Sequence, residues 1–503
     1  MSEAWEGVMS EKTVGAQGLI MNDPLIFEQG APGRVAYALP PGGIPEKRPE
    51  DLLPENHVRQ EIRGLPEVSE VDVVRHYTRL SQWNYGIDLG FYPLGSCTMK
   101  YNPKINEDLA ALPGFTQTHP YQGLASSQGT LRLMYALQEM LGEIVGLDAV
   151  SLQPSAGAHG ELTGMLMIHA YHADRGESRS KVIIPDSAHG TNPASSALCN
   201  YRAVSLPSDS RGLISPATLA ETMDQDVAAL ILTNPNTLGL FEEDILKVTE
   251  IVHANGGLIY CDGANLNALL GIARFGDMGV DVVHMNLHKT FSTPHGGGGP
   301  GSGPIAVAGR LAPYLPVPIV EKEGDRYLLQ EDRPKSIGKI RAFYGSVGVL
   351  VRAYAYILSM GPEGLKRAAE VAVVNANYLR AKLKNSYHLP YDRICKHECV
   401  FSDKHQADRG VQTIHIAKRL MDYGFHPPTI YFPLIVQGAL MMEPTETESQ
   451  ETLDQFAAAM AAIDRETREN PDVVINAPSK TKATRLDETQ AARSPCLTCC
   501  GVE

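Results

Sequence analysis

Short apolar runs alternate with amphipathic segments through the middle of this chain. Each run consists of aliphatic or β-branched residues over a few positions, which is typical of a buried strand. The runs occupy residues 182–184, 228–233, 258–261, 282–285 and 305–308. Between them the apolar period becomes helical, as in residues 244–254, which Asn255-Gly256-Gly257 ends. This alternation predicts an α/β fold built on a doubly wound, mostly parallel sheet.

The pattern changes on both sides of this middle part. Residues 1–75 are polar and then rich in proline and glycine, which predicts an extended N-terminal arm, and a helix is expected at 69–83. Residues 76–345 form the predicted large domain, which includes a strong helix at 126–147. Ligands of such sheets bind beyond the carboxyl ends of the strands.

A smaller α/β C-terminal domain is predicted for residues 346–475. Two helices, at 341–359 and 363–383, lead into it with Gly361-Pro362 as the break between them. Strands are expected at 413–416 and 430–436, and helices near 417–423 and 448–466. Residues 476–503 form a polar tail that contains cysteines.

Composition and charge narrow the class of protein. The 44 lysines and arginines face 58 aspartates and glutamates, for a net charge of −14, which argues against binding to nucleic acid or an anionic membrane. The sequence has no apolar run near the roughly 18 residues of a membrane span, and its acidic start is unlike a secretory signal. Scattered cysteines fit a reducing compartment, so we expect a cytoplasmic protein.

The strongest candidates for catalytic residues lie around Lys289. It follows the apolar run at 282–285 and precedes a glycine-rich loop at 296–303, while Asp262 ends the preceding run. A lone lysine on a loop is more often simply solvated, and the order of lysine and glycines is wrong for a nucleotide P-loop. Together, however, a lysine and an aspartate after neighbouring strands fit pyridoxal phosphate. The amine forms a Schiff base with the cofactor aldehyde, and the carboxylate pairs with the protonated ring nitrogen.

Two further segments fit the same cofactor. Ala156, Gly157 and Ala158 open a helix-like segment, where backbone N–H groups and the helix dipole can bind a phosphate. His189 follows the run at 182–184 and could stack on the cofactor ring. The order of these elements therefore predicts a pyridoxal-phosphate site.

The polar loop at 92–104 is ambiguous from its residues alone. Ser96, Cys97 and Thr98 could face a ligand, but from composition alone a structural turn is the favoured interpretation. The histidines beside Lys289 are ambiguous too, because each could be a packed core residue. Of these we expect only His288 to contact the cofactor.

Long motifs resemble one family, the glycine decarboxylase P-protein of the glycine cleavage system. The resemblance spans residues 25–493, and the chain length is similar to that of subunit 2 of the split bacterial form. The motifs are PLGSCTMKYNP at 93–103, QPSAGAHGE at 153–161, DSAHGTNPAS at 186–195, TNPNTLGLFE at 233–242, DGANLNALLG at 262–271, NLHKTFSTPHGGGGPGSGP at 286–304 and EPTETES at 443–449.

The resemblance implies the type I fold of pyridoxal-phosphate enzymes and a specific reaction. A glycine dehydrogenase of this kind releases CO2 from glycine and passes the aminomethyl group to the lipoyl arm of H-protein. It implies Lys289 as the catalytic lysine and Asp262, His189, Ala156, Gly157 and Ala158 as further cofactor-binding residues. It also implies that Ser96, Cys97 and Thr98 approach glycine, and that a homologous subunit 1 completes an α2β2 heterotetramer. Apart from the resemblance, we also predict cofactor contacts for Ala264, which lies shortly after Asp262, and for His288, which precedes Lys289.

Other interpretations of the function stay open from the sequence alone. Transamination or aldol cleavage could occur on the same fold, and a non-catalytic half could support an active partner. We expect no metal site, because a closed zinc site needs four ligands at set spacings. Neither the tail cysteines Cys496, Cys499 and Cys500 nor the cluster at 395–399 supplies them alone.

Overall fold

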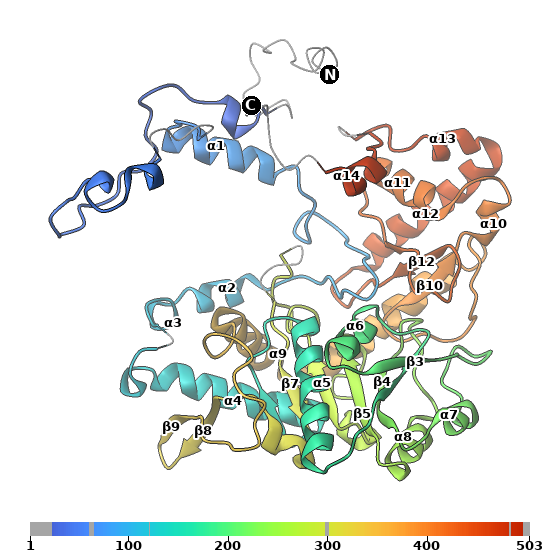
Figure 1. Cartoon of the computed structure of the whole chain (residues 1–503). Coiled ribbons are helices and arrows are strands. Elements are labelled where there is room, and N and C mark those ends of the chain that lie inside the picture. The colour runs from blue at the N-terminus through green and yellow to red at the C-terminus, as the bar shows by residue number, and fades with distance from the viewer. Residues whose placement is uncertain (1–22, 60–64, 120, 297–300, 482–483, 496–503) are drawn as a thin grey trace. The chain divides into compact units, whose positions relative to one another are not determined.

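The main sheet of the chain has seven strands (Figure 1). They are β1 (Ala149–Ser151), β2 (Lys181–Pro185), β3 (Arg202–Leu206), β4 (Val227–Thr233), β5 (Leu258–Gly263), β6 (Val282–Met285) and β7 (Ile305–Val307). Their order across the sheet is β1-β7-β6-β5-β4-β2-β3. Strand β7 runs antiparallel to both of its neighbours, β1 and β6, and the other neighbouring pairs of this sheet are parallel. The predicted α/β class and the mostly parallel sheet are confirmed.

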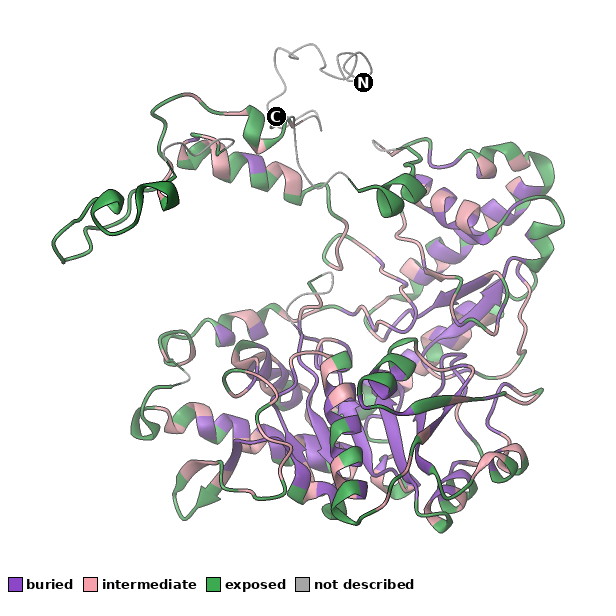
Figure 2. Ribbon diagram, in the orientation of Figure 1, coloured by how far each residue is buried: buried purple, intermediate pink, exposed green. Residues whose placement is uncertain are grey.

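Helices cover both faces of this sheet in the computed structural model, which describes residues 23–59, 65–119, 121–296, 301–481 and 484–495 (Figure 1). Alternate strand residues point into two separate hydrophobic clusters, one of which holds Leu230 and Ile259 and the other Ile231 and Tyr260. Figure 2 shows the central strands as buried, whereas the edge strand β3 is largely exposed. Each fully buried aliphatic side chain contributes roughly 1.5–3 kcal/mol, so these two clusters stabilise the sheet that carries the site.

The remaining helices and turns follow the predicted pattern closely. Helices at 126–147, 244–254 and 448–466 are confirmed as α4, α8 and α12 with small shifts at their ends. The α-helices are α1 (Glu70–Ser81), α2 (Lys104–Ala110), α3 (Pro113–Thr116), α4 (Gln128–Val145), α5 (Gly157–Asp174), α6 (Thr191–Leu198), α7 (Pro216–Thr222), α8 (Ile245–Ala254), α9 (Val347–Leu383), α10 (Lys404–Ala407), α11 (Thr413–Asp422), α12 (Gln450–Glu469), α13 (Pro471–Ile475) and α14 (Glu488–Arg493).

The span α9 consists of two helical segments that meet at the predicted break. Gly361 has non-helical backbone angles, φ 62° and ψ 179°, and Pro362 follows it, so the helix is kinked where the sequence indicated. Residues before and shortly after the kink pack into the core of the large sheet. Ala376, Leu379 and Leu383 pack into a second core.

That second core lies beside a three-stranded antiparallel sheet. The sheet is formed by β10 (Cys399–Ser402), β12 (Ala439–Met442) and β11 (Thr429–Ile430), in that order. The predicted strand at 413–416 is wrong, because these residues begin α11, whose apolar side faces the core. The predicted strand at 430–436 is wrong in extent, since β11 ends at Ile430 and the next strand is β12. A separate hairpin pairs β8 (Ile319–Glu323) with β9 (Arg326–Gln330).

Contacts divide the chain into two units. One comprises residues up to 89 with those from 480 onward, and the other comprises residues 90–479. The predicted boundary between domains at 345 and 346 stays a prediction. No helix among the described residues has the length and apolar character needed to cross a bilayer. The tail cysteines Cys496, Cys499 and Cys500 lie outside the described residues.

Candidate active site

Three predicted site residues lie at the carboxyl ends of parallel strands of the large sheet. Asp262 is the penultimate residue of β5, Lys289 lies on the turn after β6, and His189 lies on the turn after β2. The carboxyl ends of parallel strands meet at one edge of a sheet, and the register places Asp262 opposite His284 of β6. The structure therefore brings these predicted residues to one edge, where ligands of such folds bind.

The Lys289 side chain is buried and makes one direct hydrogen bond there. Its Nζ donates to the carbonyl oxygen of Ser96 at 2.7 Å. Ser96 and Thr98 have positive φ angles, 65° and 44°, which are uncommon for residues other than glycine. The loop at 96–98 is thus bent into an unusual conformation beside the lysine. Cys97, between them, is half-buried, and burial raises the pKa of its thiol.

Asp262 is buried, and the groups around it favour its ionised form. Its Oδ1 accepts a hydrogen bond from the backbone N–H of Ala264 at 2.9 Å, and lies 3.2 Å from Nε2 of His284. Burial opposes ionisation, but the fields of His284, His189 and Lys289 lower the Asp262 pKa to about 2. Such a carboxylate is suited to pair with a protonated ring nitrogen.

A tyrosine that the sequence analysis missed fixes the tautomer of His284. The Tyr260 hydroxyl lies 2.5 Å from His284 Nδ1, and burial raises the pKa of Tyr260 well above its usual range. A protonated phenol donates to Nδ1, so the ring proton is on Nε2 and points at Asp262. The resulting relay runs from Tyr260 through His284 to Asp262.

The start of α5 is suited to bind a phosphate. The helix begins at Gly157 after Ala156, and no side chain caps its first turn. A Cβ on Gly157 would lie 2.6 Å from Asn286 Oδ1, and one on Gly303 would lie 2.0 Å from the Ala156 oxygen. Only glycine allows this close approach of backbone to backbone. Uncapped N–H groups and the helix dipole favour an anion here, although Ala158 itself is exposed.

Unsatisfied polar atoms also lie around the lysine. Within the described part of the chain, Asn286 Oδ1, Thr290 Oγ1 and His288 Nδ1 are buried without a hydrogen-bond partner. Buried polar groups nearly always have partners, so such atoms indicate a ligand or solvent contact. The lysine, carboxylate and uncapped helix together form a donor set that fits pyridoxal phosphate.

His189 and His288 are the two histidines that we expected to contact the cofactor. His189 Nε2 is 3.0 Å from Ser96 Oγ, and its ring stacks on Phe432, with centroids 5.5 Å apart and planes 16° apart. Burial lowers its pKa to about 4, which leaves a neutral, flat ring. His288 packs near His295, with ring centroids 5.5 Å apart, and burial lowers its pKa to about 3.

Two buried carboxyl groups join this site from the second lobe, which is the part of the chain built on the sheet of β10, β11 and β12. The sequence analysis gave neither group a role. Glu398 precedes β10 and Glu443 follows β12. Glu398 Oε2 accepts the backbone N–H of Ser96 at 2.8 Å, and Glu443 Oε2 accepts that of Thr98 at 2.9 Å. The sequence signals were the motif at 443–449, which begins with Glu443, and the cluster at 395–399, which contains Glu398.

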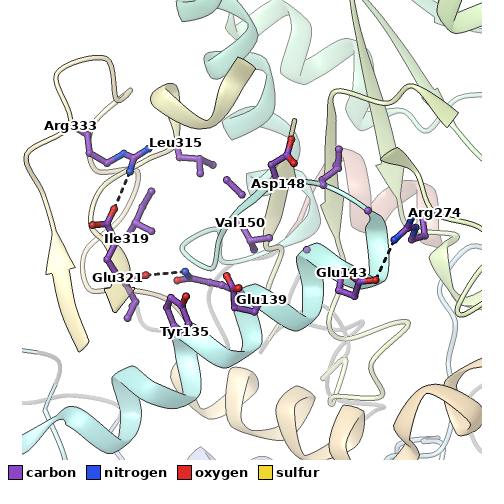
Figure 3. Close-up of a pocket in the computed structure, with 16 residues that line it drawn as sticks. Tyr135, Glu139, Glu143, Asp148, Val150, Arg274, Leu315, Ile319, Glu321 and Arg333 are labelled. Carbon is purple, nitrogen blue, oxygen red and sulfur yellow. Dashed lines mark hydrogen bonds and ion pairs between the residues drawn. The ribbon is translucent and has the colours of Figure 1, made fainter. Parts of the chain in front are cut away.

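A separate hollow of about 480 Å³ lies against α4, β1 and the β8 segment (Figure 3). Gln138 Nε2 donates to the Val320 oxygen at 3.1 Å within it, and Glu321 pairs with Arg333 at 3.3 Å. Its lining residues include none of the predicted cofactor or substrate residues. We therefore assign the chemistry to the carboxyl edge of the sheet.

Comparison with known proteins shows which family the chain belongs to. The sequence profile of the glycine cleavage system P-protein matches residues 46–335, and that of the glycine dehydrogenase C-terminal domain matches residues 368–483. The chain belongs to the P-protein family. Among relatives of this family, "probable glycine dehydrogenase (decarboxylating) subunit 2" of Caldanaerobacter subterraneus subsp. tengcongensis is 59% identical, over 94% of this chain and 98% of the relative. The protein of the same description from Exiguobacterium sibiricum is also 59% identical, over 94% and 96%.

Solved structures support the same fold at lower identity. The crystal structure of a glycine decarboxylase P-protein in inhibitor-bound form has a TM-score of 0.70 and 22% identity, over 82% of this chain and 95% of that one. Glutamate decarboxylase of Lactobacillus brevis has a TM-score of 0.61 and 14% identity, over 82% and 97%. The predicted P-protein family and the type I fold of pyridoxal-phosphate enzymes are confirmed.

Proposed function

We propose that this P-protein chain carries pyridoxal phosphate on Lys289 and uses it to decarboxylate glycine, with transfer of the aminomethyl group to the lipoyl arm of H-protein. The observation that carries the assignment is the buried Lys289 amine at the same sheet edge as the ionised, buried Asp262. A half that only supported a catalytic partner would need neither group in that arrangement.

Each residue of the donor set has a distinct task. When bound, pyridoxal phosphate supplies an aldehyde that condenses with amines and a ring that stabilises a carbanion. Lys289 would hold it through Nζ, and Asp262 would keep the proton on its ring nitrogen. Ala264 supports this role, since its N–H orients the carboxylate. The backbone of residues 156–158 would bind the phosphate, and the flat ring of His189 would lie against the cofactor.

The chain must also control protons and the substrate. Lys289 donates to Ser96 in the present arrangement, so its amine must release that contact and lose a proton before it can attack a carbonyl carbon. The same amine takes up a proton when glycine replaces it. The loop of Ser96, Cys97 and Thr98 lies at this amine, and we assign it to the glycine side of the site.

The proposed transfer step balances without a further reactant. Glycine loses its carboxyl group as CO2, and the bonding electron pair stays on the methylene carbon. That carbon attacks one sulfur of the lipoyl disulfide, so a C–S bond forms, the S–S bond breaks and the second sulfur leaves as a thiolate. Glycine is thereby oxidised and the lipoyl group reduced.

The chain is proposed to work with subunit 1 in an α2β2 heterotetramer. The description of its relatives as subunit 2 implies a partner subunit. Helix α1 supports a docking role for the arm, because Val71, Val74 and Tyr77 on it are more than half exposed. Five described cysteines are free thiols, which fits the proposed cytoplasmic location.

The test is to trap the cofactor linkage in the purified chain. Borohydride reduction after addition of pyridoxal phosphate should place the added mass on the peptide that contains Lys289. Lys100, a second buried lysine that pairs with Glu446 at 2.8 Å, is the internal control. A label on Lys100, or none on Lys289 even with subunit 1 present, would reject the assignment. Glycine, subunit 1 and lipoylated H-protein, added in turn, then show which partner is needed for the absorbance change and for release of CO2.

A further inference from the structure

Glu398 and Glu443 are cross-strand neighbours on the second lobe. The register pairs Cys399 of β10 with Met442 of β12, so the glutamates just outside these strands lie side by side. Both side chains are fully buried, with 0% exposure. Like carboxylates at such positions repel each other, and burial adds a desolvation cost to each charge.

Each carboxyl group uses one oxygen to hold the same loop. Their Oε2 atoms accept the backbone N–H groups of Ser96 and Thr98, the two residues with positive φ. Between these residues the loop presents the Ser96 carbonyl to Lys289 Nζ. The pair therefore stabilises a strained backbone that faces the reacting amine.

The remaining charges around the pair do not balance two carboxylates. His397 Nε2 lies 3.9 Å from Glu398 Oε1 and 4.0 Å from Glu443 Oε1, but burial lowers the His397 pKa to about 3, so the ring is neutral. Glu446 also faces the pair, but Lys100 neutralises it, and the Cys97 thiol is protonated. Lys289 is then the one nearby cation among the described residues, and because it also faces the ionised Asp262 it cannot balance two further carboxylates.

We propose that Glu398 and Glu443 carry one proton between them and act as positioning residues, which hold residues 96–98 against the reacting end of Lys289. A singly charged pair accepts both backbone N–H groups and avoids two adjacent buried negative charges. The direction of the pKa shifts agrees, because burial raises the pKa of Glu443 to about 7 and burial with the Glu443 charge raises that of Glu398 well above its usual range. The positioning role of the pair in catalysis rests on the proposed function, whereas the presence of one proton on the pair does not.

Infrared spectroscopy of the cofactor-free chain counts this proton directly. The protonated-carboxyl C=O band at pH 7 should fall by one carboxyl equivalent in Glu398→Gln and by the same amount in Glu443→Gln. The double variant should lose one equivalent as well, and not two. Loss of two equivalents in the double variant would mean that both groups are protonated, and no loss would mean that both are ionised; either result overturns the proposal.

A metal ion is the competing occupant. His397 Nε2 and the two Oε1 atoms lie at most 4.8 Å from one another. A cation between them could therefore be about 2.2–2.5 Å from all three atoms, which is a suitable distance for a divalent cation. One equivalent of metal in the purified chain, lost in Glu443→Gln, would overturn the shared proton.

Hydrogen exchange tests the positioning role. Glu443→Ala should speed exchange of the Thr98 amide by at least about tenfold, because a hydrogen bond to a charged acceptor is lost. Glu443→Gln keeps an acceptor oxygen and should remain within about threefold of the natural protein. Glu242→Gln is the matched control, since Glu242 is buried and accepts the Ile214 N–H at 2.9 Å away from this loop. Equal exchange in Glu443→Ala and the control would reject the positioning role.

Discussion

Substitution of Gly303 by alanine tests whether the start of α5 binds the phosphate. A Cβ at Gly303 would lie 2.0 Å from the Ala156 oxygen, 2.5 Å from the Ala156 carbonyl carbon and 3.0 Å from the Gly157 nitrogen. Ordinary contact begins near 3.4 Å, so the two backbones must separate by about 1.4 Å. Neither side is a flexible side chain, and overpacking of this kind costs roughly 1–3 kcal/mol.

That separation displaces the uncapped N–H groups from the phosphate. We expect Gly303→Ala to bind pyridoxal phosphate at least about tenfold more weakly, equivalent to about 1.4 kcal/mol. The assay is an absorbance titration of the cofactor-free chain, and circular dichroism verifies that the variant is folded. Unchanged affinity in a folded variant would refute the phosphate assignment.

Two other glycines separate this effect from general damage. A Cβ on Gly301 would lie 2.7 Å from His288 Nδ1, which belongs to a side chain that can rotate, so Gly301→Ala should weaken binding less than Gly303→Ala. Gly129 has nothing within 4 Å of a built Cβ, and alanine there should leave cofactor affinity unchanged. Equal losses at positions 301 and 303 would contradict the backbone argument.

Three further outcomes follow from the site and the arm. Because the pKa of Asp262 is lowered on folding, its ionised carboxylate stabilises the fold above about pH 4, and this contribution disappears as the pH falls toward 2. Asp262→Asn should remove roughly 2 kcal/mol of this acid-sensitive stability, as measured by urea titrations at several pH values. The same variant should lose glycine decarboxylation. Tyr260→Phe leaves His284 Nδ1 without its donor, so an NMR tautomer measurement should show Nε2–H less populated, while an unchanged ratio contradicts the relay. Val71→Asp with Val74→Asp should weaken assembly with subunit 1 in sedimentation experiments but leave cofactor binding intact, and unaltered assembly would exclude that face.

The sequence could predict the large sheet because strands that are buried on both faces are continuous apolar runs. All seven residues of β4 are buried, and its run was recognised on that basis. The same reasoning failed at residues 413–416, where β-branched residues suggested a strand. In the structure His415 and Gln412 form a capping box, and the apolar period continues as a helix, so local capping and packing outweigh β propensity there.

The site could be predicted only as far as it follows strand ends. Lys289 and Asp262 each come after a recognisable strand, so their shared edge was foreseeable. Glu398 and Glu443 reach residues 96–98 from about 300 residues away in sequence, through a lobe whose strands are short. Burial of a glutamate has no local sequence signal, and for that reason the pair escaped prediction.

Helix α9 has a consequence for how the chain loses its structure. Its residues from Val349 to Ala369 belong to the core of the large sheet, and those from Ala376 to Leu383 belong to the core of the second lobe. Both cores therefore share a continuous set of backbone hydrogen bonds beyond the kink. Melting either core exposes one end of the helix and removes support from the other, so residues 90–479 should unfold in one cooperative transition, and a fragment cut at residue 345 should not fold alone.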